Sequence, residues 1–455
     1  MDPSPRPPRR RPLRRHPLPP LVAALGLAAG LLAPASPAAA QSVAPGPAAP
    51  VPAPEVFDQP GGFYDTRGLP VGAPGAVLRS EAAPLPLAVT LPGLPELPSP
   101  LPARAQRLIY QSADVDGRPV ATSGAFYDST APWTGPGVRP TVVIGPGTQG
   151  QGDSCAPSRT LETGMGVNPR TGSPTPSYEE AFALALAAQG FRVMVVDYIG
   201  LGTPGIHTYA DRVEQAHAML DGARAADALV GRSPIAFWGH SQGGGASAAA
   251  AELAPEYAPG LDLRAAYASA PPADLLAVLD HIDGSTLTGA IGYAINGMLA
   301  RYPALAGVLD RHVTDEGRAA LDDLATLCVL DLRSRYGYHT TDQWTRTRER
   351  LGPLMRTEPD ALRVLDHQRI GTRRPAVPVL LSGGIHDDII PVGQVEQLGR
   401  DWCSLGATVS LHHETTPPAP GFTHAAAAVT NFPLALQFVR DRLAGVPAPN
   451  DCGRI

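Results

Sequence analysis

Short apolar runs recur along this chain, and longer amphipathic or Ala-rich segments separate most of them. Uninterrupted apolar runs are typical of strands that are buried on both faces of a parallel sheet. Alternation of such strands with helices predicts a mostly parallel sheet that is covered by helices on both sides. The predicted strands are residues 140–145, 191–197, 234–238, 263–268, 377–382 and 408–412, and the clearest predicted helices are residues 178–189, 212–230 and 243–253.

Two parts of the chain depart from this alternation. Residues 107–112 and 120–127 alternate polar and apolar side chains around Asp116-Gly117, which predicts an antiparallel pair before the parallel strands. Between about residues 272 and 372 there is no convincing strand pattern, only helical segments such as residues 287–302 and 318–332. We interpret this interval as a helical cap that is inserted into the sheet domain.

The predicted strand at residues 234–238 runs directly into Gly239-His-Ser-Gln-Gly243, and an Ala-rich helical pattern follows. A strand, G-x-S-x-G and a helix form the nucleophile elbow of α/β-hydrolases, a turn so sharp that its serine is strained and exposed. By itself the five-residue pattern also fits a surface turn, because the chain has 48 glycines. Its position between strand and helix favours Ser241 as a nucleophile and predicts an α/β-hydrolase fold.

A serine hydroxyl needs a base that takes its proton, and that base needs a carboxylate to orient it. In this fold the acid follows a late strand and the histidine follows the last one. The strand at residues 377–382 opens into Gly383-Gly-Ile-His-Asp-Asp, which makes Asp387 the candidate acid and leaves Asp388 as a surface carboxylate. The proline-rich loop after the last strand contains His424, the candidate base.

Other histidines compete with His424 for the role of base. His386 adjoins the candidate acid and would be poorly placed to face the serine. His412 and His413 lie on or just after the last strand, where a partly exposed structural role fits better. His207, in the segment after the strand at residues 191–197, is also interpreted as structural.

Negative charge that develops on a substrate oxygen must be met by preorganised donors. One predicted donor is the backbone N–H of Gln242, at the start of the elbow helix, where the helix dipole helps. The other is expected from the glycine-rich loop after residues 140–145, with Thr148 and Gln149 as candidates. The loop lacks the Lys-Ser/Thr ending of a P-loop, so an oxyanion loop is the better interpretation. This chemistry needs no metal and no organic cofactor.

Residues 1–40 predict a signal peptide, with six arginines, an apolar stretch broken by Pro19 and Pro20, and three alanines before Gln41. Nothing later in the chain predicts a membrane span. Without this leader the formal net charge falls from −6 to −11. An acidic chain with no basic cluster is a poor nucleic-acid binder. We therefore expect a secreted protein, with an Ala/Pro-rich flexible lead-in at residues 41–60 and a hydrolase domain at residues 61–455.

The cysteines all lie after the predicted leader, at Cys155, Cys328, Cys403 and Cys452. Oxidising surroundings and an even count favour two disulfides over free thiols. Their spacing fits no zinc ribbon and no redox C-x-x-C motif. Three pairings are possible, and proximity in sequence favours Cys403 with Cys452, which leaves Cys155 with Cys328.

Several segments together resemble the secretory lipase family, which includes the yeast lipase A type and many exported bacterial proteins. They are residues 145–158, 197–208, 238–245 and 385–391, and the resemblance extends from about residue 63 to the C-terminus. It implies a triad of Ser241, Asp387 and His424, the disulfide pairing favoured above, and a helical cap that shapes an acyl-chain tunnel. His386 departs from the family, in which a proline or small residue often precedes the acid.

These observations predict a secreted carboxylic-ester hydrolase, in particular a triacylglycerol lipase, whose substrate is a lipid or another ester. A short-chain or polyester esterase and an acyltransferase would use the same triad, and only the cap and acyl site separate them from a lipase. A catalytically inactive hydrolase-fold binding protein is the alternative from another class, and the intact Ser–Asp–His set argues against it. No motif specifies an oligomeric state.

Overall fold

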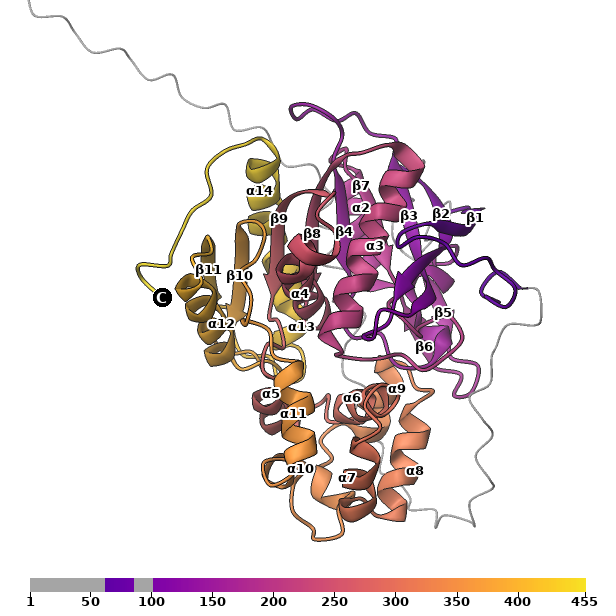
Figure 1. Ribbon diagram of the computed structural model, residues 1–455, viewed down its shortest axis with the longest axis vertical. Coiled ribbons are helices and arrows are strands. Elements are labelled where there is room, and N and C mark those ends of the chain that lie inside the picture. The colour runs from indigo at the N-terminus through magenta and orange to yellow at the C-terminus, as the bar shows by residue number, and fades with distance from the viewer. Residues whose placement is uncertain (1–61, 86–100) are drawn as a thin grey trace, which may run out of the picture. The chain divides into compact units, whose positions relative to one another are not determined.

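The computed structural model describes residues 62–85 and 101–455. The strands of its main sheet are β1 Val77–Ala83, β2 Ala103–Ala113, β3 Pro119–Ser129, β4 Thr141–Gly145, β7 Arg192–Val196, β8 Pro234–His240, β9 Asp262–Ser269, β10 Val379–Gly384 and β11 Val409–Glu414. They lie in the order β1-β2-β3-β7-β4-β8-β9-β10-β11 (Figure 1). The strands β1, β2, β3 and β7 pair antiparallel, and all pairs from β7 to β11 are parallel. The predicted mostly parallel sheet with an antiparallel beginning is confirmed.

Three strands of the structure were not predicted. The edge strand β1 has mostly exposed or half-buried side chains, so it lacks the apolar run that identifies a buried strand. The strands β5 Met165–Val167 and β6 Pro174–Pro176 form a separate two-stranded sheet. Each of these two is only three residues long, which is too short to show a period.

Helices cover both faces of the sheet, which explains why its central strands are apolar throughout. On β8, Ile235 and Phe237 pack in one core with α3 Arg212–Val230, α4 Gln242–Tyr257 and α12 Val392–Ser404. The intervening Ala236 and Trp238 pack in a second core with α2 Tyr178–Ala187 and α14 Phe432–Leu443. Since successive side chains of a strand point to opposite faces, both sets must be apolar.

The interval between β9 and β10 is helical, and its helices gather at one end of the sheet (Figure 1). We call this set the cap. It consists of α5 Leu275–Ile282, α6 Ala290–Leu299, α7 Leu305–His312, α8 Asp315–Leu324, α9 Val329–Tyr336, α10 Leu351–Met355 and α11 Pro359–His367.

The expectation of one continuous helix at residues 318–332 is wrong, because α8 ends at Leu324 and α9 begins at Val329. At this break, Leu327 and Val329 pair with the loop that follows β4. Val329 N donates to Gln149 O at 2.8 Å, and Gln151 N donates to Leu327 O at 3.0 Å. A strand-like contact to another segment requires extended backbone, so the helix is interrupted there.

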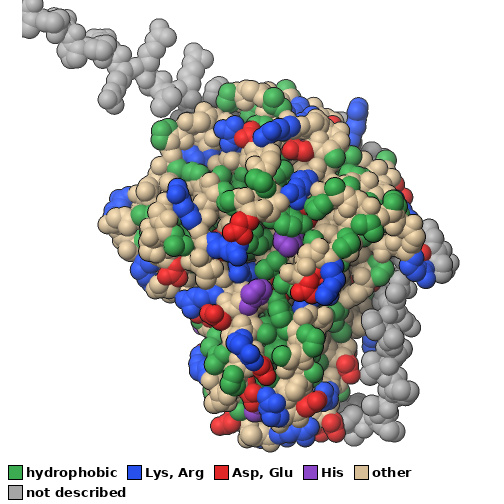
Figure 2. All heavy atoms as spheres, viewed as in Figure 1, with side chains coloured by type: hydrophobic (Ala, Val, Ile, Leu, Met, Phe, Trp, Pro, Cys, Tyr) green, Lys and Arg blue, Asp and Glu red, His purple; other side chains and the backbone are tan. Residues whose placement is uncertain are grey.

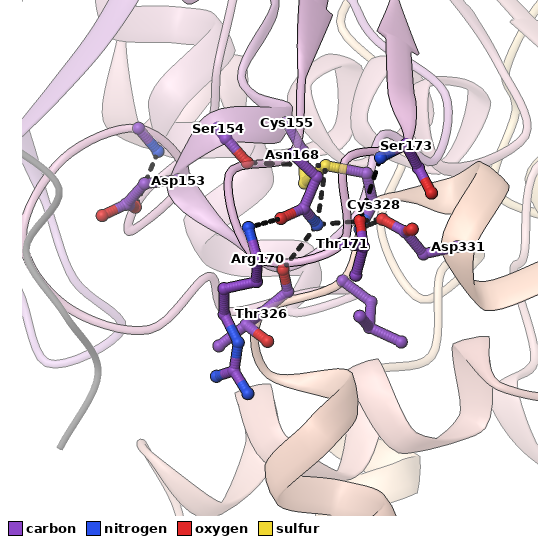
Figure 3. The surroundings of a disulfide bond; sticks show 12 residues. Asp153, Ser154, Cys155, Asn168, Arg170, Thr171, Ser173, Thr326, Cys328 and Asp331 are labelled. Atoms are coloured by element: carbon purple, nitrogen blue, oxygen red, sulfur yellow. Dashed lines mark hydrogen bonds between the residues drawn. A yellow bond between two sulfur atoms is a disulfide. The ribbon is translucent and has the colours of Figure 1, made fainter. Parts of the chain in front are cut away.

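A disulfide between Cys155 and Cys328 reinforces this contact (Figure 3). Asn168 lies beside it and donates through Nδ2 to the Thr326 carbonyl at 3.1 Å and to Asp331 Oδ2 at 2.9 Å. The same Asp331 oxygen accepts from Cys328 N at 3.2 Å, at the start of α9. The covalent bond and this polar frame together join the cap to the loop after β4.

The second disulfide, Cys403–Cys452, ties α12 to the C-terminal segment. That segment also pairs with the last strand of the sheet, because Asp451 N donates to Val409 O at 2.7 Å. The structure thus has the pairing that proximity in sequence favoured.

The surface in the view of Figure 2 carries acidic and basic side chains that are interspersed rather than gathered by sign. Within the described ranges, no helix has the length and apolar character needed to cross a membrane. The predicted signal peptide at residues 1–40 and the lead-in at residues 41–60 lie outside the described residues.

Removal of the two disulfides should have unequal effects on stability. We expect the Cys155→Ser/Cys328→Ser variant to lose about 2–5 kcal/mol of unfolding free energy. The Cys403→Ser/Cys452→Ser variant should lose about 1 kcal/mol less, because its bond closes a shorter loop. The sequence separations are 173 and 49 residues. Urea unfolding followed by circular dichroism measures both, and a larger loss in the second variant would contradict the expectation.

Candidate active site

Ser241 occupies the turn between β8 and α4 in a strained backbone conformation, with φ 59° and ψ −124°. A residue with a Cβ atom rarely adopts positive φ, and such strain persists only where the surroundings impose it. Here Ser241 N donates to the carbonyl of Ser269, at the end of β9, at 2.9 Å. The side chain lies at an apolar cavity and is 8% exposed. The predicted elbow geometry is therefore present.

The two glycines of the pentapeptide are required by close backbone contacts. A Cβ atom on Gly243 would overlap the carbonyl oxygen of Gly145, at the end of β4. A Cβ atom on Gly239 would overlap the carbonyl of Gly243 itself. The strand, the turn and the helix approach so closely that only glycine fits at these positions.

Asp387 and His424 form the acid–histidine pair that the sequence predicted. Both carboxylate oxygens of Asp387 lie near His424 Nδ1, at 3.0 and 2.8 Å. Asp387 Oδ1 also accepts from the backbone N–H groups of Ile389 and Ile390 at 2.9 and 2.8 Å, which fixes the carboxylate. A carboxylate only accepts hydrogen bonds, so the proton of His424 is on Nδ1 and Nε2 is the basic nitrogen.

The electrostatics of this pair favour an ionised acid and a basic imidazole. Burial acts to raise the pKa of Asp387, but the charge and hydrogen bond of His424 and two backbone N–H groups lower it to about 2. Burial acts to lower the pKa of His424, but the charges of Asp387 and Asp388 and the hydrogen bond to Asp387 raise it above its ordinary value. The carboxylate is thus ionised at any pH where the imidazole titrates.

His424 lies beside the elbow. Its ring contacts the ring of His240, the residue before Ser241, with 4.5 Å between centroids. Its Nε2 atom is buried and has no hydrogen-bond partner among the described residues. Catalytic hydrogen bonds are often long in unliganded enzymes and tighten when substrate binds. The free Nε2 atom is therefore suited to take a proton from a neighbouring group.

Asp388 is not the surface carboxylate that the sequence suggested. It is half-buried, and its two oxygens accept from Gly421 N at 2.6 Å and from His424 N at 3.0 Å. His424 is in the first turn of α13 Thr423–Thr430, where backbone N–H groups lack helical partners. Asp388 satisfies one of them and fixes the loop that carries the imidazole. No sequence pattern distinguishes this role from surface exposure.

The oxyanion loop candidate, residues 145–149, leaves the sheet beside the elbow because Gly145 on β4 pairs with Gly239 on β8. Buried Glu179 of α2 holds it, since Glu179 accepts from Gly147 N at 2.7 Å and from Gln149 Nε2 at 2.8 Å. Burial raises the pKa of Glu179 to about 8. Thr148 lines the cavity with Ser241, whereas Gln149 does not. Of the two candidates, Thr148 is therefore the one that faces the reaction centre.

Gln242 faces the same cavity and is held by His207. His207 Nδ1 lies 3.2 Å from the Ile199 carbonyl, which can only accept, so the other nitrogen carries no proton. That nitrogen accepts from Gln242 Nε2 at 3.0 Å. Burial lowers the pKa of His207 to about 4, so the neutral form persists at neutral pH. The structural interpretation of His207 agrees with these contacts.

The other histidines that competed for the role of base lie away from these contacts. His386 is exposed and His412 is half-buried. His413 is exposed and pairs with Glu396, with 2.9 Å between Nε2 and Oε1.

The cavity at Ser241 extends into the cap and is almost entirely apolar. Its few polar side chains include Thr148, Ser241 and Gln242, next to the elbow. Aliphatic side chains from α5, α6, α7, α10 and α11 make up most of the remainder, among them Leu279, Ile291, Leu309, Leu351 and Val364. Such a cavity fits an extended apolar group whose one polar end lies at the serine.

The amino-acid sequence is similar to a known family model and to several known proteins. Residues 171–451 match the family model described as secretory lipase, which is more than half of the chain. The chain belongs to the secretory lipase family. It is 29% identical over 405 residues to a Mycobacterium tuberculosis protein named "Probable inactive lipase MT1628", covering 85% of this chain and 82% of that protein. It is 28% identical over 304 residues to "Secreted triacylglycerol lipase LIP3" of Malassezia restricta, covering 65% of this chain and 62% of that protein.

A solved structure supports the fold of this secretory lipase family member. Candida antarctica lipase A in its closed state is similar with a TM-score of 0.68 at 19% identity, covering 84% of this chain and 85% of that chain. The predicted family and the predicted α/β-hydrolase fold are both confirmed. Membership in the family supports a hydrolase of the lipase or esterase type.

The contacts of Asp388 predict a change in pH dependence. In the Asp388→Asn variant a negative charge near His424 is lost, so the pKa of His424 should fall. Since a base must be neutral to accept a proton, and His424 is the predicted base, we expect the acid limb of kcat/KM to move to lower pH, together with a lower maximal rate. Profiles of ester hydrolysis from pH 4 to pH 9 measure both.

Two variants serve as controls for this prediction. Asp388→Glu keeps the charge and should leave the acid limb closer to that of the wild type. Glu396→Gln removes a carboxylate that pairs with the exposed His413 and should not move the limb. An acid limb that stays in place in Asp388→Asn would show that this charge does not act on the base.

Proposed function

We propose that this protein is a secreted, serine-dependent carboxylic-ester hydrolase and, within that class, a triacylglycerol lipase. One observation carries the proposal. The imidazole of the Asp387–His424 pair contacts His240, the residue before a strained serine, and that serine lines an apolar cavity. An activated hydroxyl at the mouth of an apolar cavity suits an ester with a hydrocarbon acyl chain.

In the proposed reaction His424 Nε2 takes the proton of Ser241, and the serine oxygen attacks the ester carbon. The tetrahedral intermediate carries its negative charge on the former carbonyl oxygen, which the backbone N–H groups of Gln242 and Thr148 stabilise. The intermediate collapses, His424 gives its proton to the leaving alcohol, and an acyl-enzyme remains. Water, with His424 as its base, then attacks the acyl-enzyme in the same way. The ester bond to Ser241 breaks, the serine regains its proton from His424, and the fatty acid leaves.

Asp387 orients His424 and stabilises the imidazolium that forms in each half of the reaction. Its position supports this role because it is anchored by two backbone N–H groups as well as by His424. The neighbouring His240 carries no competing charge, because burial, with a smaller effect from the charge of His424, lowers its pKa to about 3. Of the two adjacent histidines, only His424 would then become protonated during the reaction.

Export is proposed from the leader-like first 40 residues and from the two disulfides, which suit an oxidising environment. The name of the Malassezia restricta relative, a secreted triacylglycerol lipase, supports both the location and the substrate class.

The name of the Mycobacterium tuberculosis relative favours one alternative, a hydrolase fold without catalysis. The residues of this chain argue against an inactive hydrolase fold, because Ser241, Asp387 and His424 are all present with the contacts described above. A short-chain or polyester esterase and an acyltransferase would use the same residues. These differ from a lipase in the acyl site and in the acceptor of the acyl group.

Hydrolysis of p-nitrophenyl esters from acetate to palmitate tests the proposal. We expect activity that extends to long acyl chains, and a loss of at least about a thousandfold in kcat in Ser241→Ala. Ser247→Ala is the matched control, because Ser247 is a buried serine of α4, the helix that follows Ser241, and its hydroxyl has no hydrogen-bond partner among the described residues.

Each other outcome selects an alternative. Activity that survives in Ser241→Ala would show that another group is the nucleophile. Rates that vanish beyond butyrate would indicate an esterase. No activity of the wild type on any of these esters would favour the inactive binding protein.

A further inference from the structure

The hydroxyl groups of Thr148 and Tyr209 form a hydrogen bond inside the cavity, with 2.6 Å between their oxygen atoms. Both residues line the same cavity as Ser241. The mechanism above uses the backbone N–H of Thr148 and leaves both hydroxyls without a role. A hydrogen-bonded polar pair in a largely apolar cavity therefore needs a separate explanation.

Thr148 lies close to the serine because two parallel strands leave the sheet together. Gly145 of β4 is in register with Gly239 of β8. Two residues further on, a Cβ atom on Gly147 would lie 3.4 Å from the carbonyl of His240. Thr148 follows Gly147 and Ser241 follows His240. The contact between Gly147 and His240 therefore brings the threonine close to the serine.

The threonine is held in place from two sides. Its backbone carbonyl accepts from the hydroxyl of Tyr178 at 2.7 Å, and the preceding N–H, that of Gly147, donates to buried Glu179. Thr148 itself is 6% exposed. Its hydroxyl is thus fixed before any substrate binds, which is the property that an oxyanion donor requires.

The ring of Tyr209 is also fixed. It packs edge-on against His207, with 5.8 Å between centroids, and edge-on against Tyr293 of the cap helix α6, with 5.7 Å. His207 in turn accepts from the side chain of Gln242, whose backbone N–H is the other oxyanion donor. The segment at residues 207–209 therefore contacts both sides of the proposed oxyanion site.

The direction of the hydrogen bond follows from the acidity of the two groups. A phenol is a far stronger acid than an aliphatic alcohol, so it is the better donor, and the threonine oxygen accepts. Burial raises the pKa of Tyr209 to about 12, so the phenol keeps its proton at neutral pH. The threonine proton is then left to point elsewhere, since the described residues provide Thr148 Oγ1 with no other partner.

We propose that the Thr148 hydroxyl is a side-chain donor to the oxyanion and that Tyr209 is a positioning residue, which orients and polarises that hydroxyl by donating to it. This inference rests on the proposed function of Ser241. The O–H···O⁻ bond forms as negative charge develops on the substrate oxygen, and no proton needs to leave either residue. The donor acts mainly on the transition state, so it affects kcat more than KM.

A double-mutant cycle tests the proposal. Thr148→Val removes the hydroxyl at nearly constant shape and should lower kcat about 100-fold, the lower end for loss of one oxyanion donor. Tyr209→Phe removes only the supporting hydrogen bond and should lower kcat about fivefold. If Tyr209 acts through Thr148, the double variant should have the kcat of Thr148→Val alone. KM should change little in all three.

Two further variants separate this role from a structural one. Thr148→Ser keeps the hydroxyl and should retain most of the wild-type kcat. Tyr110→Phe removes another buried phenol, which donates to the Ala218 carbonyl at 3.0 Å and is not in the site, so kcat should stay unchanged. Thermal unfolding of each variant checks that the fold is kept, and Thr148→Ala replaces Thr148→Val if the valine is not accommodated.

Affinity for an alkyl boronic acid provides a second readout, since the boronate forms a tetrahedral adduct with the serine without turnover. We expect Thr148→Val to weaken this affinity by about the same factor as it lowers kcat/KM. A full kcat in both Thr148→Val and Thr148→Ala, or effects of Thr148→Val and Tyr209→Phe that multiply in the double variant, would overturn the proposal. Either result would leave the proposed function unaffected. The proposed function itself fails if Ser241→Ala stays active, or if the wild type shows neither ester hydrolysis nor binding of the boronate.

Discussion

The site depends on one steric constraint, the contact between the first turn of α4 and the end of β4. Gly243 lies against the Gly145 carbonyl so closely that no side chain fits between them. This contact forces the sharp turn that gives Ser241 its positive φ. It also sets residues 145–149 beside the serine. The strain at Ser241 and the position of the proposed oxyanion loop are therefore two results of the same packing.

A second constraint is the burial of carboxyl groups near the serine, because each buried polar group needs a hydrogen-bond partner. Two adjacent aspartates find their partners in different parts of His424. Asp387 contacts the imidazole of His424, and Asp388 contacts the backbone that carries it. On the other side, Glu179 binds the oxyanion loop through Gly147 N and the side chain of Gln149. The proposed reacting groups are held by carboxyl groups on both sides, so little reorganisation remains when substrate binds.

The sequence was sufficient for those features that rest on local chemistry. The strands buried on both faces, the elbow at Ser241 and the positions of Asp387 and His424 after late strands follow from patterns that the fold imposes. The role of Asp388 was missed, because acceptance from two distant N–H groups leaves no local pattern. The break between α8 and α9 was missed for the same reason, since it arises from pairing with residues 149–151. The contact between Thr148 and Tyr209 likewise joins residues 61 positions apart.

The cap and the proposed oxyanion loop are joined into one structural unit. Gln149 and Gln151 pair with Val329 and Leu327 at the break between α8 and α9, and the Cys155–Cys328 disulfide joins the same two segments covalently. Tyr293 of α6 contacts Tyr209, which contacts Thr148. The side chains that would bind an acyl chain therefore share a frame with the donors that would stabilise the oxyanion. Free energy from burying the chain in the cap can then hold the ester carbonyl against those donors, which is how binding far from the reacting atoms contributes to rate.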